Sequence, residues 1–190
     1  MSVQIERRLF SVSDFYKMLD VGIFTEDDRV ELLDGEIITM SPIDAKHAAI
    51  VDRLVRVLIQ YLDDRAIVRS QNPVQLNDYS EPLPDIAILK WDDDFYTDHH
   101  PLPADTLLMI EVANTSLAYD RKKKLPRYAR AGIPEVWIVN IEKNVVEQYS
   151  SPTGDEYTVR RNVKYGEIVR SKSVPKLELP TEVIFGRRRA

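Results

Sequence analysis

Apolar side chains recur along this 190-residue chain at two spacings, one typical of helices and one typical of strands. Residues 47–62 carry apolar side chains every three or four positions with arginines outside the apolar stripe, which predicts an amphipathic helix. A short helix is predicted at residues 11–22, where either of two serines can cap the first turn. A third is predicted at residues 115–131, with a kink or a broken first turn at Pro126.

Short runs rich in Ile, Val and Leu predict the strands. They cover residues 30–33, 36–40, 67–76, 85–89, 107–113, 135–140, 145–149, 157–163 and 168–169. The dipeptide Asp34-Gly35 between the first two favours a tight hairpin turn. The order strand, helix, strand over residues 107–140 predicts a βαβ crossover with a parallel pair, and the last three runs predict peripheral antiparallel hairpins. The pattern predicts one α/β domain, residues 1–190, with a mixed central sheet flanked by helices.

The composition is typical of a soluble globular domain, with 44% apolar and 30% charged residues. Without cysteine, the chain has no disulfide framework, no cysteine-ligated zinc and no thiol nucleophile. No apolar run reaches the roughly 20 residues of a transmembrane helix and no export signal is visible, so we expect no membrane attachment and a cytoplasmic location. The net charge of −5 argues against a uniformly basic surface but is compatible with a local basic face.

Two carboxylates stand in predicted buried strands, and a lysine cluster follows them. Asp85 and Glu111 each lie in an apolar run, where an unpaired charge is costly. Together with the lysines they suggest a metal site with a cation beside it. Helical spacing puts Lys124 on the same face as Asp120, which favours it over its two neighbouring lysines. The alternative is a pair of strand-end acids satisfied by caps or salt bridges, followed by a solvated basic run.

This ordered set resembles the PD-(D/E)XK nuclease superfamily and, more closely, the Uma-two group of endonucleases within it. The resemblance rests on residues 31–36, the helix from His47, Pro84-Asp85, Glu111-Val112, Asp120-Arg121, Lys124 and residues 128–139. One position departs from the wider superfamily, whose lysine usually follows two residues after the acidic residue. Ala113 stands there, and the lysine of the Uma-two group lies on the following helix, which fits Lys124.

The resemblance implies a restriction endonuclease-like fold and a Mg²⁺- or Mn²⁺-dependent endonuclease that hydrolyses phosphodiester bonds in DNA. Asp85 and Glu111, with the backbone carbonyl of Val112, would hold the metal ion. Lys124 would activate the water or stabilise charge in the transition state. Glu31 matches an additional acidic group that the superfamily often supplies from its N-terminal region, although it could also be an exposed cross-strand partner.

Candidate nucleic-acid contacts lie on two helices. Residues 120–130 contain six basic side chains and one acidic side chain, a local excess that could follow a phosphate backbone. Arg121, Lys122 and Arg127 are the contacts we predict there, and a solvated helix face is the alternative. His47 could contact a phosphate, support Glu31 or lie on the surface. The arginines at 187–189 could assist, or form a frayed tail.

Two other interpretations stay open at the level of the sequence. The chain could be a non-catalytic module that binds nucleic acid or a partner and inherited the nuclease fold, because fold alone does not establish activity. It could also be a structural homo-oligomer with an interface near Trp91, Phe95 and Tyr96. For the nuclease we expect a homodimer, since two sites most easily cut both strands of a duplex. The sequence is compatible with DNA or RNA as the substrate, and with either a duplex or a single strand.

Overall fold

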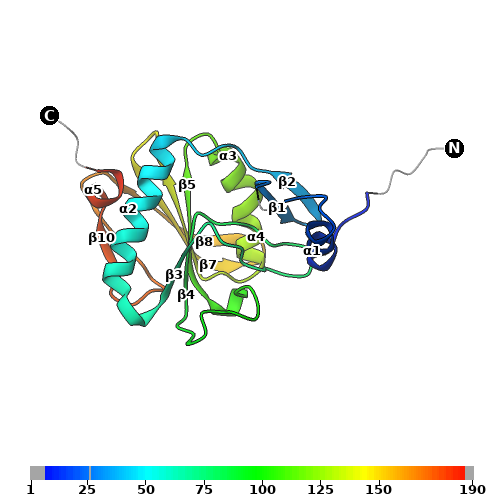
Figure 1. Ribbon diagram of the computed structural model, residues 1–190. Helices are drawn as coiled ribbons and strands as arrows, with labels where there is room; N and C mark the ends of the chain where they lie inside the picture. The colour runs from blue at the N-terminus through cyan, green and yellow to red at the C-terminus, as the bar shows by residue number, and fades with distance from the viewer. Residues whose placement is uncertain (1–6, 26, 187–190) are drawn as a thin grey trace.

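The structure, a computed structural model, describes residues 7–25 and 27–186 as a layered α/β arrangement (Figure 1). Its central sheet has six strands in the order β3-β4-β5-β6-β7-β8. Their bounds are β3 (Ile67–Ser70), β4 (Ile86–Leu89), β5 (Thr106–Ala113), β6 (Glu135–Asn140), β7 (Val145–Thr153) and β8 (Glu156–Lys164). β5 and β6 are parallel, with Glu111 opposite Ile138, and every other neighbouring pair is antiparallel. The mixed sheet and the crossover are therefore confirmed.

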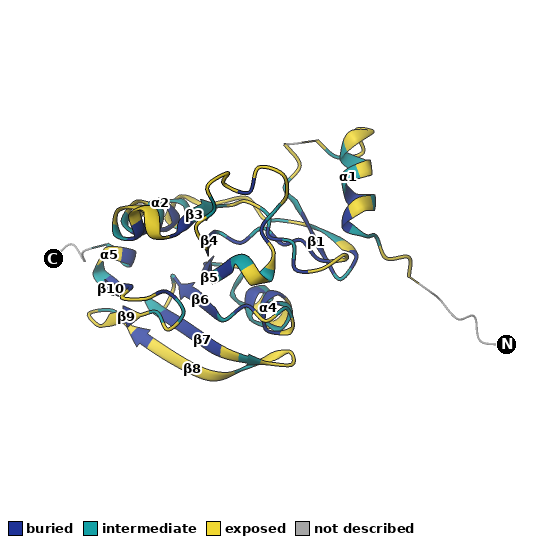
Figure 2. Cartoon of the chain, turned by 90° about the horizontal axis from the view of Figure 1, so that it is seen from below, coloured by how far each residue is buried: buried dark blue, intermediate teal, exposed yellow. Residues whose placement is uncertain are grey.

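Helices cover both faces of this sheet, which explains why its middle strands are apolar on both sides. The long helix α2 (Ala45–Leu62), the short helix α5 (Thr181–Phe185) and the small sheet of β9 (Ile168–Arg170) and β10 (Glu178–Pro180) lie on one face. The helical segment of residues 117–130 lies on the other. Figure 2 shows the buried strands between α2 and α4. Two short 3₁₀ turns, η1 (Asp63–Arg65) and η2 (Pro103–Asp105), complete the connections.

One strand prediction differs from the structure. The strand predicted at 67–76 ends at Ser70, because Gln71 adopts a positive φ of 54° and Pro73 has no N–H to continue a ladder. The hydroxyl of Ser70 and the N–H of Gln71 both donate to the carbonyl of Asp85, at 3.2 and 3.1 Å. The predicted antiparallel hairpins are confirmed: β7 and β8 pair at the edge of the central sheet, and β9 pairs with β10 in a small sheet of its own.

The helix predicted at 115–131 contains an irregular turn. It consists of α3 (Leu117–Tyr119), a π-helical turn η3 (Asp120–Lys124) and α4 (Leu125–Arg130). The N–H of Leu125 donates to the carbonyl of Asp120, five positions back. Pro126 lies in the first turn of α4, where the missing N–H costs little. The predicted irregularity is thus real, and it takes the form of one wide turn that leaves both Asp120 and Lys124 buried.

The N-terminal part forms a small unit beside the sheet. Helix α1 (Val12–Asp20) begins with a capping box between Ser11 and Asp14, as its serine predicted. It packs its Phe15 against the hairpin of β1 (Val30–Leu33) and β2 (Glu36–Thr39). Asp34 and Gly35 both have positive φ, as a tight primed turn requires. No helix in the described ranges is long and apolar enough to cross a membrane.

Candidate active site

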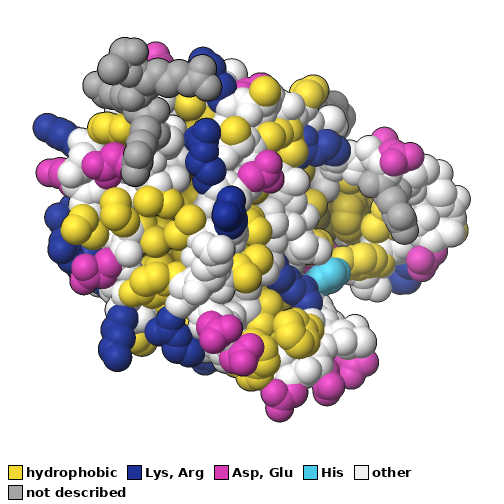
Figure 3. Space-filling view, turned by 60° about the vertical axis from the view of Figure 1, so that its left-hand side comes forward, with side chains coloured by type: hydrophobic (Ala, Val, Ile, Leu, Met, Phe, Trp, Pro, Cys, Tyr) yellow, Lys and Arg dark blue, Asp and Glu magenta, His cyan; other side chains and the backbone are white. Residues whose placement is uncertain are grey.

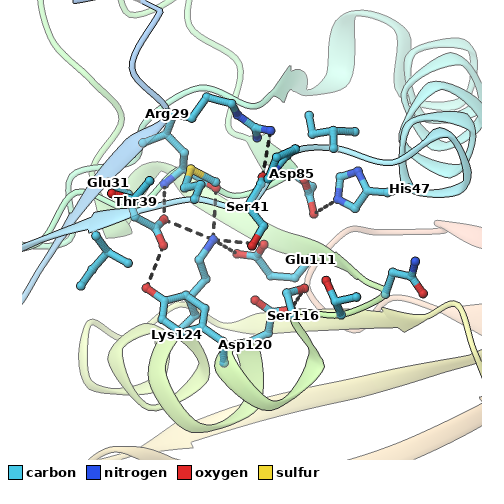
Figure 4. Close-up of a pocket in the computed structure, with 18 of the residues that line it drawn as sticks. Arg29, Glu31, Thr39, Ser41, His47, Asp85, Glu111, Ser116, Asp120 and Lys124 are labelled. Atoms are coloured by element: carbon cyan, nitrogen blue, oxygen red, sulfur yellow. Dashed lines mark hydrogen bonds and ion pairs between the residues drawn. The ribbon is translucent and has the colours of Figure 1, made fainter. Parts of the chain in front are cut away.

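A cavity of about 310 Å³ lies where the hairpin, the start of α2, the end of β5 and the π turn meet. Five of the predicted site residues line it: Glu31, His47, Asp85, Glu111 and Lys124. Figure 4 shows that these side chains come from separate elements and point toward a common centre. Residues far apart in sequence therefore form one polar cluster.

Asp85 stands immediately before β4 and links two elements. Its Oδ2 accepts the backbone N–H of Val112 at 2.8 Å and lies 3.0 Å from Nε2 of His47. Burial of the imidazole opposes its protonation, but the hydrogen bond and the negative charge of Asp85 prevail and raise the pKa of His47. The first turn of α2 is thereby tied to the sheet through this contact.

The register of β4 and β5 explains why a proline precedes this aspartate. Ile86 faces Ile110, so continuing the ladder would place Pro84 opposite Val112. In an antiparallel ladder, the N–H and the carbonyl of one residue face the same neighbour. Pro84 has no N–H to donate to the carbonyl of Val112, and the carboxylate of Asp85 accepts the N–H of Val112 instead. The backbone ladder between the two strands therefore ends here.

Lys124 lies between two buried acids. Its Nζ is 3.2 Å from Oε2 of Glu31 and 3.2 Å from Oε1 of Glu111, and it donates to the carbonyl of Leu83 at 3.2 Å. Burial opposes the charged form, but the surrounding carboxylates outweigh it and raise the pKa of the Lys124 ammonium. The neighbouring Lys122 and Lys123 are exposed. Lys124 is therefore the lysine of the cluster that the structure brings to the acids.

Two tyrosines that the sequence did not single out orient the acids. The hydroxyl of Tyr128 donates to Oε1 of Glu111 at 2.5 Å, and that of Tyr119 donates to Oε1 of Glu31 at 3.0 Å. Burial raises the pKa of the Glu111 carboxyl well above its ordinary value, although Lys124 opposes the shift. Removal of a proton and binding of a cation at Glu111 would thus be coupled.

Asp120 adds a further buried carboxyl to the wall of the cavity. The hydroxyl of Ser116 donates to its Oδ2 at 2.7 Å. Burial raises the pKa of Asp120 to about 6, with Lys124 acting in the opposite direction. The sequence indicated Asp120 only as a residue on the same helix face as Lys124. Its burial follows from the π turn, which leaves no local signal in the sequence.

The predicted phosphate contacts on the basic helix do not line the cavity. Arg121 forms an ion pair with Glu147, in which Nε lies 2.9 Å from Oε2. Nη2 of Arg127 lies 2.6 Å from Oδ2 of Asp34. Lys122 is exposed to solvent on the outer side. The positive charge of this helix is therefore largely neutralised, and the arginines at 187–189 lie outside the described residues.

The donor atoms suit a hard cation. Asp85, Glu111 and the carbonyl of Val112 offer oxygen atoms, which Mg²⁺ and Mn²⁺ prefer. Among the described residues, no group of three or more His, Cys, Asp or Glu side chains converges as a metal site. Two carboxylates and a carbonyl fit an ion that keeps several waters, as Mg²⁺ does. They do not match the nitrogen- and sulfur-rich sets typical of zinc.

Comparison with known proteins agrees with this geometry. The Uma2 family, described as "Putative restriction endonuclease", matches residues 12–182. The chain belongs to the Uma2 family. Membership confirms the resemblance drawn from the sequence and places this Uma2 chain in a nuclease family of the restriction endonuclease-like type, whose members generally use divalent metal ions.

A solved structure has the same fold. It is the crystal structure of "a putative nuclease belonging to DUF820 from Anabaena variabilis ATCC 29413", with a TM-score of 0.72 and 16% sequence identity. The match covers 93% of this Uma2 chain and 97% of that chain. Among curated proteins, none matches the sequence.

Proposed function

We propose that this Uma2 chain is a Mg²⁺- or Mn²⁺-dependent endonuclease that hydrolyses phosphodiester bonds in DNA. The observation that carries the proposal is the convergence of Asp85, Glu111 and Lys124 in one cavity, from a strand start, a strand end and a π turn. A nuclease needs a bound cation, an oriented water and a compensating positive charge near the phosphate. These three residues, with the carbonyl of Val112, offer the groups for each requirement.

The metal ligands in this proposal are Asp85, Glu111 and the carbonyl of Val112. A divalent ion bound there would polarise the phosphoryl oxygen and lower the pKa of a bound water. Asp85 is held in place by the N–H of Val112 and by His47, so its carboxylate has a fixed direction. Tyr128 does the same for Glu111. The ligands are therefore oriented before any substrate arrives.

The environment of Lys124 supports one of its two predicted roles. Its raised pKa keeps the side chain protonated at neutral pH, so it is a poor base for removing a proton from water. A fixed ammonium beside the acids is suited to stabilising negative charge that develops on the phosphate. Glu31 accepts from Lys124, Tyr119 and the N–H of Leu83, and so keeps the ammonium in position.

Cleavage of supercoiled plasmid at low salt, with Mg²⁺, Mn²⁺ or chelator, tests the proposal. We expect metal-dependent nicking by the wild type, and loss of nicking together with weaker metal binding by calorimetry in Asp85→Ala and Glu111→Gln. Asp155→Asn is the matched control, because this exposed acid pairs with Arg130 away from the cavity. Nicking that persists at wild-type rate in both cavity variants would refute the assignment.

A non-catalytic binding module is the second candidate. The observation in its favour is that Lys124 lies within ion-pair distance of both Glu31 and Glu111, so each buried acid already has a partner within the protein. Tight DNA binding without cleavage in any metal, unaffected by Asp85→Ala, would favour it. The homodimer and the cytoplasmic location are further proposals. Sedimentation at micromolar concentration tests the homodimer, because a species that stays monomeric contradicts it.

A further inference from the structure

Residues 40–44, here called the strap, form the outer wall of the cavity. All five line it, and residues 41–44 are also exposed to solvent. At one end, the N–H of Met40 donates to the carbonyl of Arg29 at 2.8 Å, and Nη1 of Arg29 donates to the carbonyl of Ser41 at 3.2 Å. Two hydrogen bonds with Arg29, just before β1, therefore hold the first end of the strap.

The other end of the strap is tied to the sheet and to α2 by one side chain. Oδ1 of Asp44 accepts the N–H groups of Lys46 and His47 and caps the helix. Oδ2 of the same carboxylate accepts from Nδ2 of Asn114, just after β5, at 2.7 Å. The strap thus runs along the cavity between two anchored ends, and Figure 4 shows Ser41 at the end held by Arg29.

The reactive groups lie deep behind this wall. The side chains of Glu31 and Glu111 are 1% and 4% exposed, and that of Lys124 is 4% exposed. Asp85 is the most accessible of the predicted catalytic acids, at 13%. A scissile phosphate must enter the cavity to reach these groups. A strand that can bend one phosphate into the cavity therefore suits these groups better than a rigid double helix.

The charges around the cavity also disfavour a duplex. Its walls carry five carboxylates against the two permanent cations Arg29 and Lys124. On the basic helix, Arg121, Arg127 and Arg130 are each paired with an acid. Figure 3 shows acidic and basic side chains interspersed on the face that it draws, without a continuous basic stripe. Both forms of DNA bind partly through such cations, but a duplex carries twice as many phosphates per length as one strand and depends on them more steeply.

We propose that the substrate of this site is an unpaired segment of DNA, such as a single strand, a flap or a loop. The inference rests on the proposed function and specifies its substrate class. An unpaired strand can pass one phosphate beneath the strap, because its backbone is not held on a helical surface. Apolar side chains of the wall, including Ile38, Met40 and Ile43, offer contact for splayed bases.

The test compares one fluorescent DNA strand alone with the same strand in a fully paired duplex. Cleavage is measured in Mg²⁺ and Mn²⁺, and binding is measured separately in Ca²⁺, with Asp85→Ala as the control for cleavage. We expect the free strand to be cut and bound at least about tenfold better, since unpairing a base from a duplex costs a few kcal/mol. An RNA strand of the same sequence is included in each assay.

Each outcome supports or overturns the preference for unpaired DNA. The inference is overturned if the duplex is cut or bound as well as the free strand or better. It is also overturned if RNA is preferred, or if no strand is bound. Preferential binding of the free DNA strand without cleavage refutes the proposed hydrolysis but retains the substrate class. Arg29→Gln, which removes the donor to Ser41, should reduce the preference severalfold, whereas the matched Arg130→Gln should not. An unchanged preference in Arg29→Gln would overturn the role of the strap.

Discussion

The carboxylate of Asp85 accepts the backbone N–H of Val112 at 2.8 Å, where a strand partner would otherwise accept it. This contact closes the end of the β4–β5 ladder with a side chain in place of backbone. It holds the carboxylate of Asp85 against the backbone of Val112, the residue whose carbonyl we propose as a further metal ligand. The dipeptide Pro84-Asp85 is thus explained by the hydrogen-bond pattern of the sheet.

Restoring a donor at position 84 should weaken metal binding. In Pro84→Ala the new N–H faces the carbonyl of Val112, which the register places opposite it. A carbonyl engaged in the ladder is a poorer ligand, and we expect the metal Kd to rise by about tenfold. Calorimetry with Mn²⁺ measures this, with Pro103→Ala in η2 as the control. Unchanged affinity in Pro84→Ala would argue against Val112 as a ligand.

Removing the cation from the buried cluster should destabilise the fold. In Lys124→Met, Glu31 and Glu111 lose the ammonium 3.2 Å from each. An uncompensated buried charge typically costs about 3–5 kcal/mol, which urea unfolding would detect. Lys123→Met, at an exposed position, should change the free energy of unfolding by less than about 0.5 kcal/mol.

A second substitution distinguishes whether the stability lost in Lys124→Met comes from charge or from packing. If charge is the cause, adding Glu31→Gln to Lys124→Met should recover part of the lost stability, because one buried carboxylate is then neutral. No recovery would indicate that Lys124 stabilises mainly through the packing of its aliphatic chain.

The tyrosine behind Glu111 should affect activity and stability together. Tyr128→Phe removes a hydroxyl that donates to Oε1 of Glu111 at 2.5 Å. Hydrogen bonds to charged groups contribute about 1.5–3 kcal/mol, so we expect a loss of this size and slower metal-dependent cleavage. Tyr157→Phe is the comparison, because its hydroxyl donates to the carbonyl of Ile133 away from the cavity. Equal cleavage rates in both variants would contradict an orienting role for Tyr128.

The ion pair between Glu147 and Arg121 should make stability depend on pH. Burial opposes ionisation of Glu147, but its hydrogen bonds with Arg121 and Tyr149 outweigh it and lower the pKa below 4.5. A lowered pKa in the folded state contributes stability above pH 4.5, which is lost as the pH falls through the folded value. The stability difference between wild type and Glu147→Gln should therefore be constant near neutrality and shrink below pH 4.5 in thermal unfolding. A difference that grew in acid would have the wrong sign.

Much of this arrangement could be predicted from local pattern. The apolar runs around Asp85 and Glu111 indicated buried strands, and the structure has a strand at each place. The Asp34-Gly35 turn and the helix from residue 47 were also visible, because each depends on residues close in sequence. The strand predicted at 67–76 was wrong beyond Ser70, because the positive φ of Gln71 and the following Pro73 divert the chain.

The rest depends on contacts that no local pattern contains. Arg121 pairs with Glu147 on β7, and Arg127 pairs with Asp34 in the hairpin. The number of basic residues in the run therefore did not indicate how many of them are unpaired and available to bind phosphate. Tyr119 and Tyr128 resemble ordinary core aromatics until the fold brings them to the acids. Their contacts, and the phosphate contacts predicted at Arg121 and Arg127, required tertiary structure to assess.

The π turn at Asp120–Lys124 sets the rotational phase of everything that follows it. A regular helix advances about 100° per residue, since it has 3.6 residues per turn. Deleting a single residue from this turn would swing the side chains on one side of the deletion by that angle relative to the other. With α4 held against the sheet, Lys124 would keep its direction, and the residues before the deletion, including Asp120, would turn away from it. The direction of the buried Asp120 carboxyl relative to the lysine is consequently set by the number of residues in the turn.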